Sequence, residues 1–325
     1  MTRHHEITPR ARPDWVAGDT IVTDSGLETW LVFHHGIDLP AFAAYPLVED
    51  ETCRALLVEY YRRHVEIARA NDMGVLLEAP TWRANPDWAA TLGHDLEQLG
   101  ASIDAGVRLV RAMGDGWAGP RPFVVGGTVG PRGDGYEPGH LMDAQAAERY
   151  HSFQVRRLAE AGVDVVSALT IGSVDEAIGI VRAADAVGVP VVISFTLETD
   201  GRLPSGMALS EAIESTDRAT DAGPVHYMIN CAHPTHFDHV FDGGRWTERI
   251  GGLRANASRR SHAELDEMVE LDEGDPDELA QAYLALQAVL PALTVVGGCC
   301  GTDDRHVAAI ARARRDDPGP HPTVG

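Results

Sequence analysis

Short apolar runs alternate with longer amphipathic stretches along most of the chain. The runs are apolar almost throughout, a pattern typical of strands that are buried on both faces of a parallel sheet. The expected strands cover residues 20–23, 74–79, 122–126, 163–168, 189–195, 224–229, 250–254 and 293–296.

Helical spacing of apolar residues fills the stretches between these runs. The expected helices cover residues 51–70, 96–113, 143–161, 173–187, 208–222, 237–241, 277–289 and 303–315, the sixth with the weakest pattern. Ser173, with Glu176 three residues later, has the spacing of a capping box. Eight alternating strands and helices predict a (β/α)₈ TIM barrel. An open doubly wound sheet is the main alternative, but no GxGxxG motif follows the first run.

The domain organisation that we expect is simple. Residues 20–315 contain no linker rich in Pro, Gly or Ser and should form a single domain, with a leader at 1–19 and a disordered tail at 316–325. The N-terminus has no apolar signal core, and no run of about 18 apolar residues could span a bilayer. The sequence therefore predicts a cytoplasmic protein.

The net charge of the chain limits the classes of partner that we expect. The formal net charge is −22, with 49 acidic and 27 basic side chains. Such a surface repels phosphate backbones and anionic lipid, so we expect neither nucleic acid nor membrane as a partner. All the basic residues are arginine, which excludes Schiff-base and phosphate-loop lysines. The chemistry must come from thiols, carboxylates, histidines or a metal.

In a barrel, active sites lie where the C-terminal ends of the strands meet the following loops. Polar and reactive residues follow several of the expected strands. They are Asp24, Ser25 and Gly26; Glu78 and Trp82; Leu169 and Thr170; Asn230 and Cys231; Asn256; and Cys299 with Cys300. We expect the segment 254–267, which includes His262, either to line a donor pocket or to form a solvated loop.

Three of the four cysteines lie just past expected strands, in TVVGGCCGT at 294–302 and at Cys231. Glycines beside Cys299 and Cys300 let the backbone turn tightly. Clustered cysteines in a reducing compartment more often bind metal than form disulfides, and three thiolates fit a catalytic Zn²⁺ with one open position. Cys53 lies in an expected helix and is predicted to be buried in the hydrophobic core, without a role in metal binding.

Histidines also flank the sixth strand, at His226 and His233. We expect both to be structural, because three thiols are already available to the metal.

Zinc bound by three thiolates suggests one kind of reaction. A substrate thiol that enters the open position loses its proton on coordination. The resulting thiolate can attack a methyl group on a positively charged sulfur or nitrogen. The enzyme's other task is to hold the methyl donor and the acceptor in line.

Four segments resemble motifs of the zinc-dependent homocysteine S-methyltransferase family. They are DSGLETWL from Asp24, SFTLETDGRLPSGMALSEAI from Ser194, INCAHP around Cys231 and GGCCGTDDRHV from Gly297. The resemblance runs from about residue 20 to residue 307. It implies a (β/α)₈ barrel, zinc on Cys231, Cys299 and Cys300, and methyl transfer to homocysteine to give methionine. No cobalamin or folate domain is added here, which resembles the short members that use S-methylmethionine or a similar onium donor. A homo-oligomer is compatible with the sequence.

One departure from the family pattern concerns the acceptor. Relatives carry a glutamate after the fourth strand, in a segment resembling FETIPSLEEA, that holds the amino group of homocysteine. This chain reads ALTIGSVDEA, with Leu169 at the matching position. Glu78 is our candidate for the missing ammonium contact, and together with Trp82 it would also suit a cationic donor. We expect Asp24, the backbone of Ser25 and Gly26, and Asn230 to bind substrate.

Other interpretations remain open at this stage. Leu169 favours the same methyl transfer with a different thiol acceptor or donor. A non-catalytic zinc-binding barrel would use the same cysteines and close the metal with a fourth protein ligand. For single residues, Asp24 followed by Ser and Gly has the pattern of a turn, and Glu78 could pair with Arg83.

Overall fold

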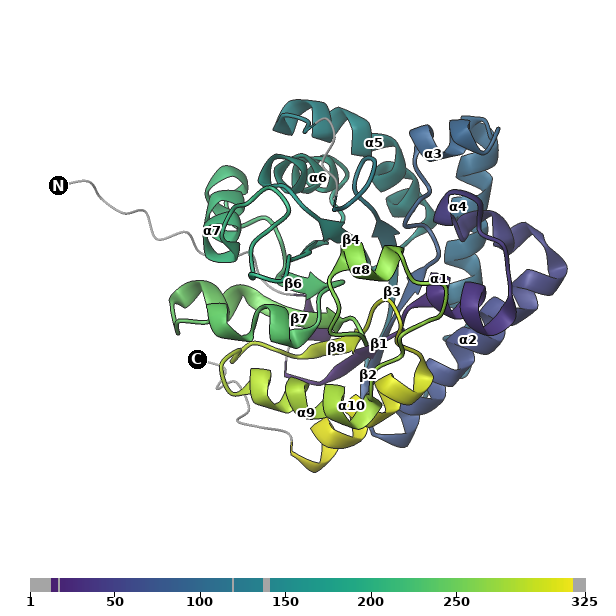
Figure 1. Ribbon diagram of the computed structural model, residues 1–325. Helices are drawn as coiled ribbons and strands as arrows, with labels where there is room; N and C mark the ends of the chain where they lie inside the picture. The colour runs from purple at the N-terminus through teal and green to yellow at the C-terminus, as the bar shows by residue number, and fades with distance from the viewer. Residues whose placement is uncertain (1–12, 17, 119, 137–140, 318–325) are drawn as a thin grey trace.

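A computed structural model describes residues 13–16, 18–118, 120–136 and 141–317. Within these residues, eight parallel strands close into a barrel in sequence order (Figure 1). The strands are β1 (Ile21–Thr23), β2 (Gly74–Ala79), β3 (Phe123–Val129), β4 (Val165–Ile171), β5 (Val191–Phe195), β6 (Tyr227–Asn230), β7 (Ile250–Ala255) and β8 (Val295–Gly298). Ile21 of β1 pairs with Val295 of β8 and closes the ring. The predicted barrel is confirmed, and the doubly wound alternative is wrong.

Helices surround the barrel. They are α1 (Leu27–Thr29), α2 (Glu51–Ala70), α3 (Pro86–Thr91), α4 (Leu96–Ala112), α5 (Ala144–Ala161), α6 (Val174–Val187), α7 (Leu209–Thr220), α8 (His262–Asp266), α9 (Pro276–Gln287) and α10 (Asp304–Asp316). Local signals set several of their ends. The Ser173 hydroxyl accepts a hydrogen bond from the Glu176 N–H at 3.4 Å at the start of α6, and Gly162 ends α5 at φ +85°.

Three predictions about local structure are wrong. Residues 237–241 form no α-helix, because the chain after β6 makes 3₁₀ turns at Pro234–His236 and Asp238–Val240. Two strands run three residues further than expected, β3 to Val129 and β4 to Ile171, and β4 has an irregular register beyond Ala168. Cys53 is partly exposed rather than core, because it lies in the first turn of α2, where its N–H donates to Asp50. The predicted leader and tail lie mostly outside the described residues.

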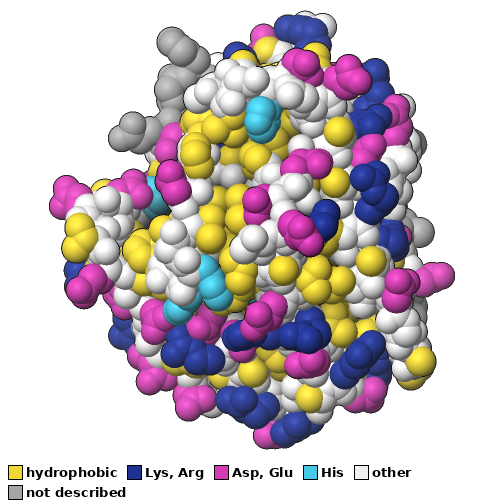
Figure 2. Space-filling view, turned by 90° about the vertical axis from the view of Figure 1, so that its right-hand side faces the viewer, with side chains coloured by type: hydrophobic (Ala, Val, Ile, Leu, Met, Phe, Trp, Pro, Cys, Tyr) yellow, Lys and Arg dark blue, Asp and Glu magenta, His cyan; other side chains and the backbone are white. Residues whose placement is uncertain are grey.

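The described residues pack in two apolar layers. One fills the inside of the barrel at its N-terminal end, and the other lies between the strands and the surrounding helices. On the face shown in Figure 2, acidic and arginine side chains are interspersed, so the excess negative charge does not gather in one patch there. No helix of the described part is long and apolar enough to cross a membrane.

Candidate metal and substrate site

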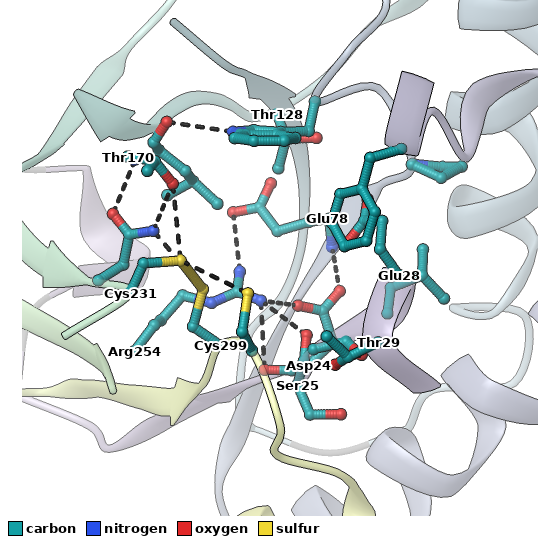
Figure 3. A pocket seen from close by; sticks show the side chains of 18 of the residues that line it. Asp24, Ser25, Glu28, Thr29, Glu78, Thr128, Thr170, Cys231, Arg254 and Cys299 are labelled. Atoms are coloured by element: carbon teal, nitrogen blue, oxygen red, sulfur yellow. Dashed lines mark hydrogen bonds and ion pairs between the residues drawn. A yellow bond between two sulfur atoms is a disulfide. The ribbon is translucent and has the colours of Figure 1, made fainter. Parts of the chain in front are cut away.

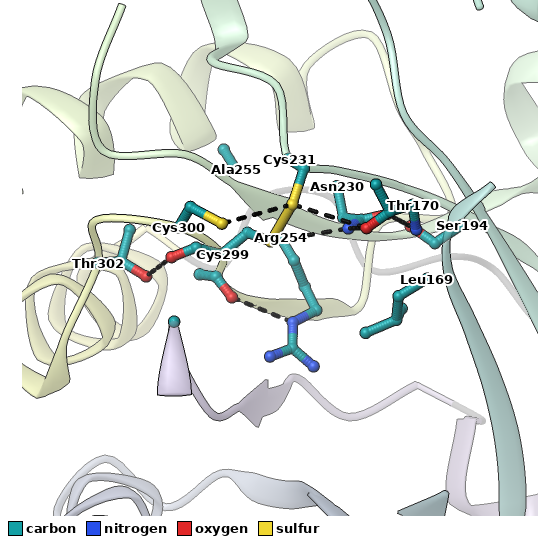
Figure 4. Close-up of a disulfide and its surroundings, with 12 residues drawn as sticks. Leu169, Thr170, Ser194, Asn230, Cys231, Arg254, Ala255, Cys299, Cys300 and Thr302 are labelled. Carbon is teal, nitrogen blue, oxygen red and sulfur yellow. Dashed lines mark hydrogen bonds between the residues drawn. A yellow bond between two sulfur atoms is a disulfide. The ribbon is translucent and has the colours of Figure 1, made fainter. Parts of the chain in front are cut away.

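Three cysteines far apart in the chain meet at the C-terminal mouth of the barrel. Cys231 follows β6, and Cys299 and Cys300 follow β8. Their Sγ atoms all lie within 4.8 Å of one another. Backbone hydrogen bonds tie both loops to the end of β7, from the Cys231 N–H to the Arg254 carbonyl (3.2 Å) and from the Cys299 N–H to the Ala255 carbonyl (2.9 Å). The structure therefore brings together the three predicted metal ligands (Figure 4).

The donor set fits a zinc ion once the thiols are reduced. In the structure Cys231 and Cys299 form a disulfide, and the Cys300 Sγ lies 3.9 Å from the Cys231 Sγ. Tetrahedral zinc with bonds of about 2.3 Å would space its sulfurs about 3.8 Å apart. Burial raises the pKa of the Cys300 thiol to about 12, so this thiol needs a cation beside it to ionise. Among the described residues, no His, Asp or Glu joins the three cysteines as a fourth ligand.

Thr170 and Asn230 hold the cysteine sulfurs in place. The Asn230 side-chain N–H₂ donates to the Thr170 Oγ1 (2.9 Å) and to the Cys299 Sγ (3.6 Å), and the Thr170 hydroxyl donates to the Cys231 Sγ (3.7 Å). Thr170 and Cys231 have φ angles of +65° and +54°. Left-handed backbone at non-glycine residues stores strain, which concentrates at functional sites. Asn230 thus contacts Thr170 and Cys299, and its predicted contact with substrate stays a prediction.

His226 and His233, which we expected to be structural, are not part of the group formed by the three cysteines in the described part of the chain. The His233 Nδ1 accepts from the Thr235 N–H at 3.3 Å and caps the turn after Cys231. Burial lowers its pKa to about 4, so His233 is neutral near pH 7.

A small inner cavity of about 80 Å³ lies beside the cysteines (Figure 3). All the residues predicted to bind metal or substrate line it. They are Asp24, Ser25, Gly26, Glu78, Trp82, Asn230, Cys231, Cys299 and Cys300. Leu169, Glu28 and Arg254 also line it.

A buried arginine from β7 organises the charges of this cavity. Arg254, Asp24 and Glu78 are each at most 5% exposed. The Arg254 guanidinium donates from Nη2 to the Asp24 Oδ1, and its Nη1 lies 3.9 Å from the Glu78 Oε1, as the dashed lines of Figure 3 show. The Asp24 Oδ2 accepts from the Glu78 N–H at 3.1 Å. Sequence reasoning missed Arg254, although a charged residue in an apolar strand was a signal.

The alternative pairing of Glu78 with Arg83 is wrong. The Arg83 guanidinium lies over the rings of Trp82 (4.2 Å) and Trp88 (4.4 Å) instead. One face of Trp82 is therefore already covered by a cation of the protein itself. The Trp82 indole N–H donates to the Leu169 carbonyl at 3.2 Å and fixes the wall of the cavity.

Carboxyl groups outnumber cations in the inner cavity. Burial raises the pKa of Glu78 to about 7, although the charge of Arg254 opposes the shift. Burial likewise raises the pKa of Glu28 to about 7, and its own backbone N–H opposes the shift. Glu28 lies within the DSGLETWL segment, but no sequence signal separated it from its neighbours. A positively charged ligand group would favour ionisation of both glutamates.

The backbone N–H groups of Ser25 and Gly26 already have partners. The Ser25 N–H donates to the Tyr60 hydroxyl at 2.9 Å, and the Gly26 N–H donates to the Thr302 carbonyl at 3.2 Å. A Cβ at Gly26 would lie 2.5 Å from the Cys299 carbonyl, so glycine allows the two strand ends to approach. Direct binding of substrate by these two amides remains a prediction.

A larger outer chamber of about 430 Å³ adjoins the inner cavity. The two share wall residues, among them Trp82, Thr170, Cys231 and Cys300. The chamber is lined by four acidic residues, Asp134, Asp266, Glu270 and Asp272. Its aromatic residues are Phe33, Phe42, Trp82 and Tyr136, and its basic residues are Arg83 and His262. Asn256 also lines it, so the segment after β7 contributes to the pocket as well as to the surface.

Tyr136 and His262 form part of the wall of the outer chamber. Their rings stack with centroids 3.4 Å apart, and the Tyr136 hydroxyl donates to the Cys231 carbonyl at 3.0 Å. The ring stacking joins the loop after β3 to α8, and the hydrogen bond joins the same loop to Cys231, which follows β6.

Comparisons with known proteins place the chain in a family. The sequence model for homocysteine S-methyltransferase matches residues 21–314. Homocysteine S-methyltransferase 2 of Zea mays is 29% identical over 61% of this chain and 60% of its own length. Selenocysteine Se-methyltransferase of Brassica oleracea var. italica is 26% identical over 58% of this chain and 57% of its own length. The chain thus spans about 60% of the length of these curated relatives.

Crystal structures of the homocysteine methyltransferase MmuM from Escherichia coli share the fold. The oxidized form superposes with a TM-score of 0.71 at 23% identity, over 91% of this chain and 96% of that one. The metallated form gives 0.70 at 21% identity, over 90% and 96%. Since the family's sequence model covers the barrel from its first strand to its last helix, this chain belongs to the homocysteine S-methyltransferase family.

Proposed function

We propose that this protein is a zinc-dependent methyltransferase that moves a methyl group from an onium donor to the thiol of homocysteine, giving methionine. The observation that carries the proposal is the group of three cysteine sulfurs, within 4.8 Å of one another, at the wall shared by the inner cavity and the outer chamber. Cys231, Cys299 and Cys300 would hold the zinc, which when bound lowers the pKa of a coordinating thiol.

The inner cavity supplies binding groups for the acceptor. Glu78 and Glu28 offer negative charge to an ammonium group, and Leu169 offers an apolar wall to a short methylene chain. Asp24 positions these groups, because it holds both the Arg254 guanidinium and the backbone of Glu78. Asn230 and Thr170 donate hydrogen bonds to cysteine sulfurs and so favour their ionised form.

The outer chamber supplies binding groups for a cationic donor. Its four carboxylates outnumber its two basic side chains, which favours a positively charged sulfur or nitrogen. Aromatic rings in the same wall can contact the onium group through their faces. Because the chamber and the inner cavity meet at Cys231 and Cys300, a donor methyl and an acceptor sulfur bound on the two sides would lie close together, as in-line transfer requires.

A screen of donors against acceptors tests this proposal. Reduced, zinc-loaded protein is incubated with S-methylmethionine, S-adenosylmethionine or betaine, and with homocysteine or another small thiol, and methylated product is measured. We expect methionine from homocysteine with at least one sulfonium donor, and no product from Cys299→Ala. No methylation of homocysteine with any donor would refute the proposal.

A different acceptor is the second candidate. Leu169 lines the inner cavity at the position where the resemblance to the family implies an amine-binding glutamate, and one relative is a selenocysteine Se-methyltransferase. The same screen decides between the two, because a thiol or selenol with a kcat/KM above that of homocysteine would replace homocysteine as the acceptor.

A further inference from the structure

Two buried polar atoms lie close together in the inner cavity without a hydrogen-bond partner in the described structure. They are the Oε2 of Glu78, an acceptor when ionised, and the Nη1 of Arg254, a donor. The Ser167 hydroxyl of β4 interacts with the Glu78 carboxylate and favours its ionised form, but it makes no hydrogen bond within the usual limits of distance and angle. The side chains form a long ion pair, with 3.9 Å between Nη1 and the Glu78 Oε1, which is beyond hydrogen-bond distance. Unpaired buried polar groups are destabilising and uncommon in folded proteins. A ligand that offered both a donor and an acceptor would satisfy the pair.

The remaining nitrogens of Arg254 are already occupied. Its Nε donates to the Gly298 carbonyl at 3.1 Å. Its Nη2 donates to the Asp24 carboxylate and lies 3.4 Å and 3.3 Å from the carbonyls of Asp24 and Ser25. These contacts hold the guanidinium in one orientation, so Nη1 is the part of Arg254 left for a ligand.

Glycine on β3 makes room for the Glu78 carboxylate. The paired residues of β2 and β3 include Glu78 and Gly126, and a Cβ on Gly126 would overlap the Glu78 Oε2. The carboxylate therefore extends over β3 inside the barrel, toward β4, the next strand around the ring. Leu169, on β4, lines the same cavity and offers no charge to an ammonium group.

Two backbone N–H groups near Asp24 that could donate to a ligand carboxylate already have hydrogen-bond partners. The N–H groups of Ser25 and Gly26 donate to Tyr60 and Thr302. Thus a negatively charged ligand group in the inner cavity finds a hydrogen-bond donor in the Arg254 Nη1, and a positively charged group finds an acceptor in the Glu78 Oε2, whose other polar neighbour is the Ser167 hydroxyl.

We propose that Glu78 and Arg254 act together as a clamp for the zwitterionic end of an α-amino acid. The Glu78 Oε2 accepts a hydrogen bond from the ammonium group, and the Arg254 Nη1 donates to the carboxylate. The inference rests on the proposed function, since it describes the acceptor of that reaction. It assigns acceptor specificity to these two residues and limits the acceptor to thiols or selenols that carry both charged groups.

Ligand analogues test the clamp on the intact zinc-loaded protein. Calorimetric titration compares the product, L-methionine, with 3-(methylthio)propylamine, which lacks the carboxylate, and 4-(methylthio)butanoate, which lacks the ammonium group. We expect each analogue to bind about 10- to 100-fold more weakly than methionine, because each leaves one buried charged group of the clamp unpaired. Equal binding of the propylamine would refute the role of Arg254.

A variant tests the role of Glu78 separately. In Glu78→Gln the shape is kept and the charge is lost, so the preference for methionine over the butanoate should fall by about tenfold, with any remaining preference due to Glu28 in the same cavity wall. Glu214→Gln, at an exposed carboxylate on α7, is the matched control and should keep the wild-type preference. An unchanged preference in Glu78→Gln would refute its role. Arg254 also pairs with Asp24, so its half of the clamp is tested with the analogues rather than by substitution.

The clamp and the proposed function can fail separately. If methionine binds with the expected preference and no donor methylates homocysteine, the clamp stands and the methyltransferase proposal fails. If homocysteine is methylated but the three ligands bind alike, the methyltransferase proposal stands and the clamp is wrong. If methionine does not bind at all, the clamp is refuted.

Discussion

The two ends of the barrel differ in what fills them. At the N-terminal end the interior is closed by apolar side chains, most of them β-branched, from Ile21, Leu76, Val124, Val165, Val192, Val225, Met228 and Val295. At the C-terminal mouth the interior holds Asp24, Glu78, Arg254 and the three cysteines. The first end follows the rule for a packed core, and the second departs from it at several positions.

The departures at the mouth depend on the rest of the barrel. Thr170 and Cys231 adopt left-handed backbone, and the Glu78 and Arg254 side chains each keep an unpaired buried atom. Each feature is destabilising by itself and persists only where the surrounding structure enforces it. Stability and the proposed function are thus divided along the barrel axis, with the apolar end supporting strain at the reactive end.

The largest effect should come from removing a metal ligand at the mouth. We expect Cys300→Ala to lose stoichiometric zinc and to lower kcat/KM for methyl transfer by on the order of 10³ or more, because metal-ion stabilisation of charge contributes several kcal/mol. Metal analysis and the transfer assay measure this. Cys53→Ala, at the remote cysteine of α2, is the control and should keep both zinc and activity. Full zinc content in Cys300→Ala would contradict the assignment.

Truncation of an apolar side chain at the closed N-terminal end should lower stability and leave substrate binding unchanged. Leu76 is 2% exposed, so Leu76→Ala should lower the free energy of unfolding by about 2–5 kcal/mol, through lost burial and the cavity left behind. Urea denaturation measures this loss. The KM of the folded variant for the acceptor should match the wild-type value, and a KM raised more than severalfold would show that the two ends are not separate.

Two adjacent glycines on β3 allow substrate binding and stability to be tested separately within one strand. Gly126 faces Glu78 inside the barrel, whereas a Cβ on Gly127 would lie 2.6 Å from Leu158 of α5, on the outside. Gly126→Ala should displace the Glu78 carboxylate and raise the acceptor KM about tenfold, the loss expected for one impaired charged contact. Gly127→Ala should instead lower stability by about 1–3 kcal/mol through overpacking and leave KM unchanged. The reverse pattern would be inconsistent with the site described above.

The smallest effect is a pH dependence of ligand affinity. Burial raises the pKa of Glu78 to about 7, so below pH 7 it is mostly protonated and cannot pair with an ammonium group. The charged groups of methionine do not titrate between pH 5.5 and 8, so its affinity should fall as the pH drops below 7, by up to about tenfold per unit. Titration calorimetry across this range measures the slope. In Glu78→Gln the affinity should depend less steeply on pH, and the remaining dependence should come from Glu28. An unchanged pH dependence in Glu78→Gln would show that Glu78 is not its source.

Much of the fold could be predicted from sequence because the strands are short apolar runs with clear ends. The cysteines were found because glycine-framed thiols after two strands are an uncommon pattern. The extension of β4 over Leu169 and Thr170 was missed, because the strand continues beyond an irregularity in register. The helix expected at 237–241 failed because 3₁₀ turns beginning at Pro234 replace it.

The charged wall of the inner cavity could not be predicted, because its contacts form only when the barrel closes. Arg254 on β7 meets Asp24 after β1 and Glu78 on β2, across more than 170 residues of sequence in each case. In the sequence, Arg254 marked only the end of an apolar run and the start of the polar segment 254–267. Likewise, the Ser25 N–H looked free until α2 placed Tyr60 against it.

X-ray absorption at the zinc edge of the reduced, zinc-loaded protein measures the coordination of the proposed metal site. We expect three sulfur neighbours at about 2.3 Å and one lighter neighbour in the resting protein. Adding homocysteine should replace the lighter neighbour with a fourth sulfur. Two or fewer sulfur neighbours, or four before any thiol is added, would contradict the claim that Cys231, Cys299 and Cys300 hold a metal with one position open to substrate.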